Sequence, residues 1–114
     1  MLSRMNDFQN RTFFDDSGRP KQGHEYQILH NLYNSGEMGV ILRWHDGKLE
    51  DDGELPAVEF QDTHIEHYHN SLLHNNSTDS NGNLRAAIIS GYGTRLEYYL
   101  NGKQVEGQNH GKSL

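Results

Sequence analysis

The chain has 114 residues, of which 10 are Lys or Arg and 16 are Asp or Glu, so its formal net charge is −6. This sign opposes direct binding to nucleic acid, which depends on cationic side chains that release counterions, and it opposes attachment to anionic lipid surfaces. The chain has no cysteine, which excludes disulfides and thiolate zinc sites. Its length suffices for one modest core, which its 32% of hydrophobic residues is expected to keep thin.

The N-terminal residues Met1 to Asn10 are polar and lack the apolar stretch of a signal peptide. No run elsewhere approaches the ~18 apolar residues of a membrane span. We therefore expect a cytoplasmic protein with a flexible N-terminus over residues 1–10, a single β-hairpin repeat domain over residues 11–107 and a flexible tail over residues 108–114.

The first part of the domain combines clear turns with one ambiguous segment. Residues 11–14 are expected to open a sheet, and residues 15–18 to form its first turn. The segment 25–33 fits both the alternation of a strand and the three-and-four spacing of a helix. The repeat pattern described below favours a strand, and a short helix is the alternative. Residues 39–45 predict a further strand, whose apolar run indicates burial on both faces.

The stretch from Leu84 to Gln104 predicts a complete β-hairpin unit. Its apolar run over residues 84–89 is too short for a stable helix and predicts a buried strand. Residues 94–101 alternate between two faces, as a half-buried strand does. Asn101-Gly102 can adopt the positive φ angles of a type I′ turn, so the chain is expected to reverse there.

The rest of the chain contains diverged copies of this unit, each with an aromatic residue just before a reversal. These residues are Phe14, Trp44, Tyr68 and Tyr99, at spacings of 30, 24 and 31 residues. A quasi-period of one hairpin is the signature of a repeat architecture. We therefore predict an all-β fold of successive antiparallel β-hairpins that form a twisted meander sheet. Whether the repeats form a single sheet or close into a barrel stays open.

Three segments carry a resemblance to a known family, namely Trp44 to Leu49, Glu50 to Glu59 and Leu96 to Lys103. They combine an aromatic strand, an Asx-Gly-Lys turn and an acidic linker ending in Leu-Pro-Ala-Val-Glu. Over roughly residues 39–107 the chain resembles the degenerate MORN-like β-hairpin repeats of bacterial, phage and giant-virus proteins, some of which are described as antitoxin-like. The resemblance implies a binding or scaffolding role rather than a fixed activity. The copy at Asn70-Ser71-Leu72 departs from the pattern.

The linker between two of these units gathers consecutive carboxylates, Glu50, Asp51 and Asp52. Its spacing lacks the alternating ligands and distal glutamate of a calcium loop, so a solvated loop is the favoured interpretation. Together with the net charge of −6, these residues are expected to steer a partner protein that carries a basic surface. The alternative is that the charge only keeps a small protein soluble.

The repeated aromatic residues have two interpretations. If they stack on one face, Trp44, Tyr68 and Tyr99 are candidate anchors for a partner, because aromatic side chains are enriched in interface hot spots. Alternatively, they form the core of the repeats themselves, as repeated aromatic residues more often do.

A cluster of histidines is a candidate metal site. On a strand, His67 and His69 project from the same face about 7 Å apart, and His74 or His45 is a candidate third ligand. Imidazole groups suit zinc or copper. The favoured alternative is a solvated face of histidines without a cofactor. A third interpretation is pH sensing, in which neighbouring protonated rings repel each other.

No catalytic motif stands out in the sequence, so we expect a protein that is not an enzyme. The favoured function is a non-enzymatic protein-binding module, inhibitory or antitoxin-like, that presents an acidic and aromatic surface to another protein. The alternatives are a small metal-binding protein built on the histidine cluster and a structural repeat in a larger assembly. In the last case, exposed sheet edges would pair with other copies of the chain and give a homo-oligomer.

Overall fold

The computed structural model describes residues 8–30, 39–60 and 64–106. Within these ranges the chain forms ten strands and no helix, so the prediction of an all-β protein is confirmed. A helix able to cross a membrane is likewise not found in the described residues. The strands are β1 His24–His30, β2 Gly39–His45, β3 Lys48–Leu49, β4 Val58–Phe60, β5 His64–Glu66, β6 Tyr68–His69, β7 Leu72–Leu73, β8 Ile88–Ser90, β9 Arg95–Leu100 and β10 Lys103–Val105.

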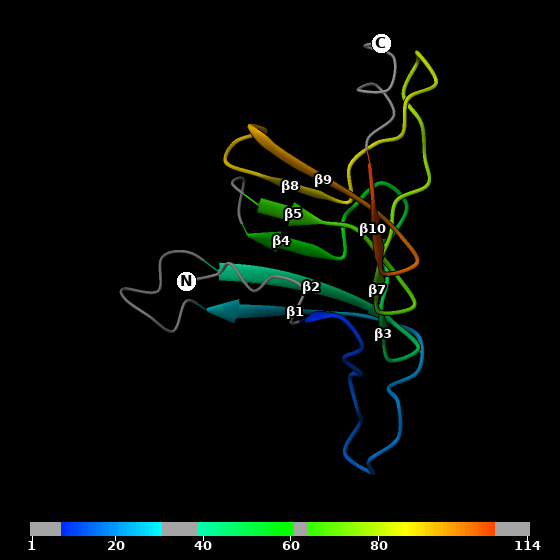
Figure 1. Ribbon diagram of the computed structural model, residues 1–114. Coiled ribbons are helices and arrows are strands. Elements are labelled where there is room, and N and C mark those ends of the chain that lie inside the picture. The colour runs from blue at the N-terminus through cyan, green and yellow to red at the C-terminus, as the bar shows by residue number, and fades with distance from the viewer. Residues whose placement is uncertain (1–7, 31–38, 61–63, 107–114) are drawn as a thin grey trace.

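The strands follow one another through an antiparallel sheet in the order β1, β2, β4, β5, β8, β9 and β10, and β3 also pairs with β2. The strands β6 and β7 form a separate two-stranded sheet. Figure 1 shows the first six strands of this order side by side, with β3, β7 and β10 in a column at one end. The arrangement is the predicted meander of hairpins, and in the described residues the sheet is open rather than closed into a barrel.

The register of the sheet identifies β2, β5 and β9 as equivalent strands. Each pairs with the strand before it in the sheet, and the pairs Gln27 with Leu42, Val58 with Glu66 and Ile88 with Glu97 occupy the same place in each hairpin. Two residues after each of these positions the chain reaches a predicted aromatic residue, Trp44 in β2, Tyr68 in β6 directly after β5, and Tyr99 in β9. The repeats that the aromatic spacing predicted therefore correspond to structurally equivalent hairpins.

Each repeat reverses at a two-residue turn with positive φ angles at both positions. The turns are Asp46-Gly47 (φ 52° and 84°), Asn70-Ser71 (53° and 63°) and Asn101-Gly102 (50° and 85°). Glycine adopts this left-handed region freely and Asn or Asp tolerates it, whereas serine rarely does. The buried Ser71 hydroxyl accepts a hydrogen bond from Leu49 N at 2.8 Å and donates one to Arg11 O at 2.6 Å. These two bonds offset the conformational cost at the turn that departs from the Asx-Gly pattern.

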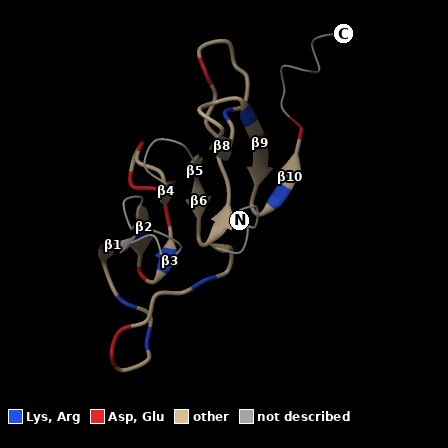
Figure 2. Ribbon diagram, turned by 90° about the vertical axis from the view of Figure 1, so that its left-hand side faces the viewer, with Lys and Arg blue, Asp and Glu red and all other residues tan. Residues whose placement is uncertain are grey.

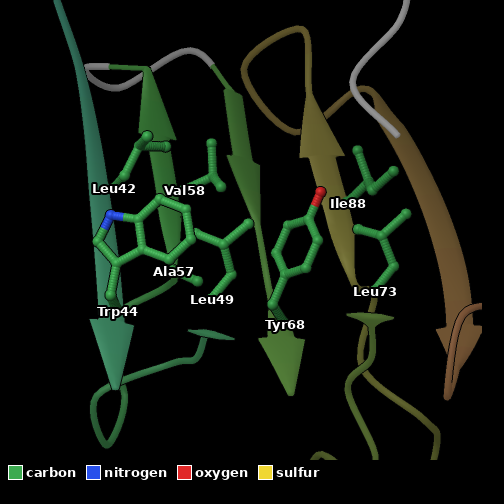
Figure 3. Close-up of a cluster of buried hydrophobic side chains, with 8 residues drawn as sticks. All are labelled: Leu42, Trp44, Leu49, Ala57, Val58, Tyr68, Leu73 and Ile88. Atoms are coloured by element: carbon green, nitrogen blue, oxygen red, sulfur yellow. The ribbon is translucent and has the colours of Figure 1, made fainter. Parts of the chain in front are cut away.

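The core lies on one face of the sheet. Its aromatic members, Trp44 and Tyr68, are 5% and 1% exposed. Phe13 stacks on Trp44 with the ring centroids 5.3 Å apart, so the segment before β1 covers part of the core. Figure 3 shows the two aromatic rings within a cluster of eight buried residues, Leu42, Trp44, Leu49, Ala57, Val58, Tyr68, Leu73 and Ile88.

In two predicted segments, pairing with other strands determines the secondary structure, rather than the local sequence pattern. Residues 25–30 belong to β1, which pairs along its whole length with β2, so the helix alternative is wrong there. Residues 31–33 lie outside the described ranges. The run 84–89 is not one strand, because only residues 88–90 form β8, while Leu84 makes an isolated bridge with Thr78. Ala86 and Ala87 between them are nevertheless buried.

Residues 8–10, which polarity placed in a flexible N-terminus, are bound to the second hairpin. Asn10 N donates a hydrogen bond to Ser71 O at 2.7 Å, and Gln9 Oε1 accepts one from Leu73 N at 2.7 Å. The polar groups of Gln9 and Asn10 therefore bond to the protein rather than to water. The composition of a segment does not reveal such bonds. Residues 1–7 and the predicted tail over 108–114 lie outside the described ranges.

Candidate functional site

The face of the sheet opposite the core carries a row of mainly apolar side chains. Successive residues of a strand point to opposite faces, so this row faces away from Leu42 and the other core residues. Its ends are open to solvent, because Ile28 is 54% exposed and Leu96 is 48% exposed. We call this row, together with Tyr26, Arg43 and Tyr98 on the same side, the open face. In register across six strands, the row consists of Ile28, Ile41, Glu59, Ile65, Ile89 and Leu96.

The polar residues in the middle of the open face compensate each other. The Arg43 guanidinium lies 3.5 Å from the Glu59 carboxylate, and it donates a hydrogen bond to Pro56 O at 2.8 Å. The solvent side of an antiparallel sheet ordinarily carries polar residues, whereas here a half-buried apolar row, interrupted by Glu59, ends in exposed apolar side chains. The open face is therefore the candidate binding surface of this protein.

The acidic linker binds the histidine strand. Glu50 Oε2 lies 2.6 Å from His69 Nδ1, and Asp51 Oδ2 lies 2.7 Å from His67 Nδ1. Asp51 Oδ1 also accepts hydrogen bonds from Ala57 N at 2.9 Å and from Tyr68 N at 3.0 Å. Glu50 and Asp51, which were predicted to steer a partner, therefore join consecutive repeats of the chain instead. Their neighbour Asp52 is exposed.

Replacing Asp51 with alanine is expected to lower the free energy of unfolding by about 2–3 kcal/mol, because it removes a charged acceptor from two backbone N–H groups and from an imidazole. Urea denaturation measures the change. The matched control is Asp52→Ala, one residue along the same linker, which should stay within about 0.5 kcal/mol of the parent protein. Equal effects of the two substitutions would show that the Asp51 contacts do not stabilise the fold.

The predicted metal ligands are divided between different partners. His67 and His69 each face their own carboxylate, and His74 Nδ1 accepts a hydrogen bond from Asn101 N at 2.9 Å. His45 instead stacks on the ring of His24, with centroids 4.2 Å apart. In residues 8–30, 39–60 and 64–106, no group of three or more His, Asp or Glu side chains is arranged to hold a metal ion.

Within the predicted cluster of His67, His69 and His74, one pair of rings lies close together, as the pH-sensing interpretation requires. The centroids of the His69 and His74 rings are 5.7 Å apart. Burial, and then the neighbouring His69, lower the pKa of His74. A lowered pKa means that His74 stays neutral to a lower pH than an ordinary histidine, which reduces the repulsion expected between two charged rings.

The aromatic residues assigned to partner binding differ in their accessibility. Trp44 and Tyr68 are core residues, so in the folded protein their rings do not face a partner. The interpretation of these two as the core of the repeats is confirmed, and their assignment as partner anchors does not hold. Tyr99 is half-buried against the core at the last repeat. Phe14 is 56% exposed and does not continue the buried series.

A carboxyl group occupies one core position. Glu66 is fully buried, accepts a hydrogen bond from Tyr68 Oη at 2.7 Å and lies 2.8 Å from His64 Nε2. Burial raises the pKa of Glu66, while the hydrogen bonds from His64 and Tyr68 oppose that shift. A carboxyl group without exposed surface does not meet a solute, so we assign Glu66 to the core rather than to the candidate binding surface.

The open face was missed by reasoning from the sequence. Its members lie on strands that are far apart in the chain, and only the register shows that they form one row. The sequence nevertheless contains a signal for this face. In two repeats an isoleucine directly precedes the residue that faces the core: Ile41 precedes Leu42, and Ile65 precedes Glu66. An apolar residue at that position indicates a strand whose second face is also apolar.

No family model, no curated protein and no solved structure matches this chain. The resemblance to MORN-like repeats therefore stays a prediction.

Proposed function

We propose that this chain is a non-enzymatic protein-binding module that binds another protein through the open face. The observation that carries the proposal is the row from Ile28 to Leu96, which crosses six strands and exposes large apolar side chains at both ends. Neighbouring strands lie about 4.8 Å apart, so the row extends roughly 24 Å. That length matches one side of a standard interface patch of about 800 Å² per partner.

The charge of the chain indicates what kind of surface the partner presents. The middle of the open face holds the compensated pair Arg43 and Glu59, whereas the chain as a whole carries a net charge of −6. Figure 2 shows the acidic residues spread over several loops rather than gathered in one patch. A partner with an apolar centre and basic residues at its rim is complementary to this distribution. Steric occlusion of that partner would give the inhibitory, antitoxin-like role that the resemblance implies.

The double variant Ile28→Thr/Ile65→Thr tests the proposal, because threonine keeps the branched shape suited to a strand while it removes apolar surface. Tagged protein is used for affinity capture from an extract of the source cells, and every bound protein is quantified. The expected result is one stoichiometric partner whose recovery falls by about tenfold with the double variant, equivalent to about 1.4 kcal/mol.

The control variant is Tyr92→Asn, which removes apolar surface from a side chain that is 80% exposed in the connection between β8 and β9. Asparagine tolerates the positive φ of 55° at this residue. The partner recovery of this variant should equal that of the parent protein. Thermal unfolding of both variants confirms that the fold is retained. Equal recovery of the same proteins by the parent and the double variant would contradict binding through the open face.

A further inference from the structure

The linkers that follow β3 and β7 leave their repeats in the same way. Glu50 N donates a hydrogen bond to Arg43 O at 3.1 Å, and His74 N donates one to His67 O at 3.0 Å. Arg43 and His67 are themselves equivalent, because each directly follows the residue that faces the core in its repeat. Glu50 and His74 therefore occupy the same place in successive repeats.

The side chains of Glu50 and His74 also make the same contact with the turn of the following repeat. Glu50 Oε1 accepts a hydrogen bond from Asn70 N, and His74 Nδ1 accepts one from Asn101 N, each at 2.9 Å. Asn70 and Asn101 are the first residues of their turns, with φ angles of 53° and 50°. The acceptor is thus a carboxyl oxygen at one junction and an imidazole nitrogen at the other.

The imidazole of His74 accepts this bond only when the ring is neutral. A neutral ring carries one proton, and since Nδ1 is the acceptor, that proton lies on Nε2. In this state the Nδ1 lone pair is occupied and Nε2 has none to offer, so His74 is not a metal ligand. A second proton at Nδ1 would place an N–H group against the N–H of Asn101 and remove the bond.

The carboxyl group at the other junction does not share this sensitivity. A carboxyl group keeps an acceptor oxygen in either protonation state. Glu50 Oε2 also lies 2.6 Å from His69 Nδ1, so a proton gained by His69 strengthens its attraction to the carboxylate of Glu50. The contact between Glu50 and Asn70 is therefore expected to persist over the pH range in which histidines titrate.

The ionisable groups around His74 determine the pH at which it gains a proton. Burial, and then the ring of His69 at a centroid distance of 5.7 Å, lower the pKa of His74, whereas Asp51 and Glu50 oppose this shift. Tyr68 lines the same small pocket and stays neutral, because burial raises its pKa. His74 is therefore expected to titrate below the ordinary histidine pKa of about 6.5.

We propose that His74 is a pH-sensitive attachment point for the last hairpin, which consists of β9 and β10. The neutral ring holds the turn at Asn101 to the preceding linker, and the protonated ring lets go of it. The hairpin of β6 and β7 lacks this response, because Glu50 holds its turn at Asn70. Acid therefore loosens the last hairpin and leaves the preceding one attached.

Two backbone bonds limit the response. Asn75 N donates a hydrogen bond to Tyr99 O at 3.1 Å, and Gly102 N donates one to Leu73 O at 2.8 Å. Backbone amide and carbonyl groups do not titrate in this pH range, so these bonds keep the hairpin in place. The expected change is therefore a local loosening around Asn101 rather than unfolding of the repeat.

The last hairpin contributes to one end of the open face. Leu96 and Tyr98 lie on β9, and β10 pairs with Tyr98 through Val105. Acid is therefore expected to weaken the binding of a partner at that end, a consequence that rests on the proposed function. The attachment through His74 does not depend on that function and is tested without a partner.

Hydrogen exchange of the nitrogen-15-labelled full-length protein, followed by NMR from about pH 7.5 to about pH 5, tests the proposal. Each rate is divided by the rate of an unstructured chain at the same pH, which removes the intrinsic pH dependence of exchange. The protection of the Asn101 amide is expected to fall by about fivefold, in step with titration of the His74 ring. The Asn70 amide is the internal control, and its protection should stay constant.

His74→Glu provides a matched variant, because it copies the residue that the preceding repeat has at this place. In this variant the protection of the Asn101 amide is expected to stay constant over the same pH range. His74→Gln carries the same expectation, since its amide oxygen accepts a hydrogen bond without added charge beside Glu50. If neither variant folds, the comparison of Asn101 with Asn70 in the parent protein still decides the question.

Four results would overturn the pH-sensitive attachment. They are a His74 ring that gains no proton above about pH 5, constant protection of the Asn101 amide while that ring titrates, equal losses of protection at Asn70 and Asn101, and a persistent loss at Asn101 in both variants. None of these contradicts protein binding through the open face, because that function is tested separately by partner capture with the double variant Ile28→Thr/Ile65→Thr.

Discussion

Replacing Trp44 with alanine is expected to lower the free energy of unfolding by about 3–5 kcal/mol, the range for truncation of a large buried aromatic residue. The ring is 5% exposed and stacks on Phe13, and its Nε1 donates a hydrogen bond to Gln27 Oε1 at 2.9 Å. Small domains have total stabilities of about 5–15 kcal/mol, so this loss would leave a large unfolded fraction. Urea denaturation followed by circular dichroism measures it.

The control for this experiment is Tyr92→Ala, which truncates an aromatic side chain that is 80% exposed. It is expected to change stability by less than about 0.5 kcal/mol. A similarly small effect of Trp44→Ala would mean that the aromatic position of the first repeat does not hold the core together. The interpretation of the repeated aromatic residues as core would then fail.

The second large effect concerns the buried pair Glu66 and Tyr68. The first repeat has Leu42 and Trp44 at these positions, so an apolar pair is compatible with the fold. Glu66→Leu alone is expected to cost about 1–3 kcal/mol, because the buried Tyr68 hydroxyl loses this acceptor, and Tyr68→Phe alone is expected to cost a similar amount. Glu66→Leu/Tyr68→Phe together should be nearly neutral or stabilising, since both polar groups are replaced.

A double-mutant cycle in urea measures the coupling between the two residues, and its pH dependence provides a second readout. The raised pKa of Glu66 means that the folded protein binds its proton more tightly than the unfolded chain. Its contribution to stability is therefore fully present below the ordinary glutamate pKa and is lost as the pH rises through the raised value. The double variant should lack this decline. Additive single effects, or an unchanged pH profile, would contradict the assignment of a coupled buried pair.

Local sequence signals were sufficient for the two Asx-Gly turns and for strands β2 and β9. Two residues with positive φ are required at each reversal, and Asp46-Gly47 and Asn101-Gly102 are among the few pairs that adopt such angles readily. Alternation along residues 94–101 likewise indicated β9. The aromatic spacing located the equivalent positions of the repeats, because Trp44, Tyr68 and Tyr99 each lie two residues after the equivalent positions Leu42, Glu66 and Glu97.

These local signals do not predict contacts between residues that are far apart in the sequence. The linker at Glu50 and Asp51 was interpreted as a solvated loop and the histidines as a separate cluster, because a charge pattern does not show which charges meet. In the folded chain the carboxylates bind His69 and His67, 19 and 16 residues away. The same limitation applies to Gln9, whose amide oxygen bonds to a residue 64 positions further along the chain.

The sequence by itself therefore determined an all-β chain of repeated hairpins, because alternation, turn residues and aromatic spacing act over a few neighbouring positions. Only the tertiary structure decided which face of the sheet is core and which is open. Those properties depend on register between segments that meet only after folding, as when Ile28 on β1 and Leu96 on β9 become the two ends of one row. The candidate site consists of such a row, so it exists only in the folded protein.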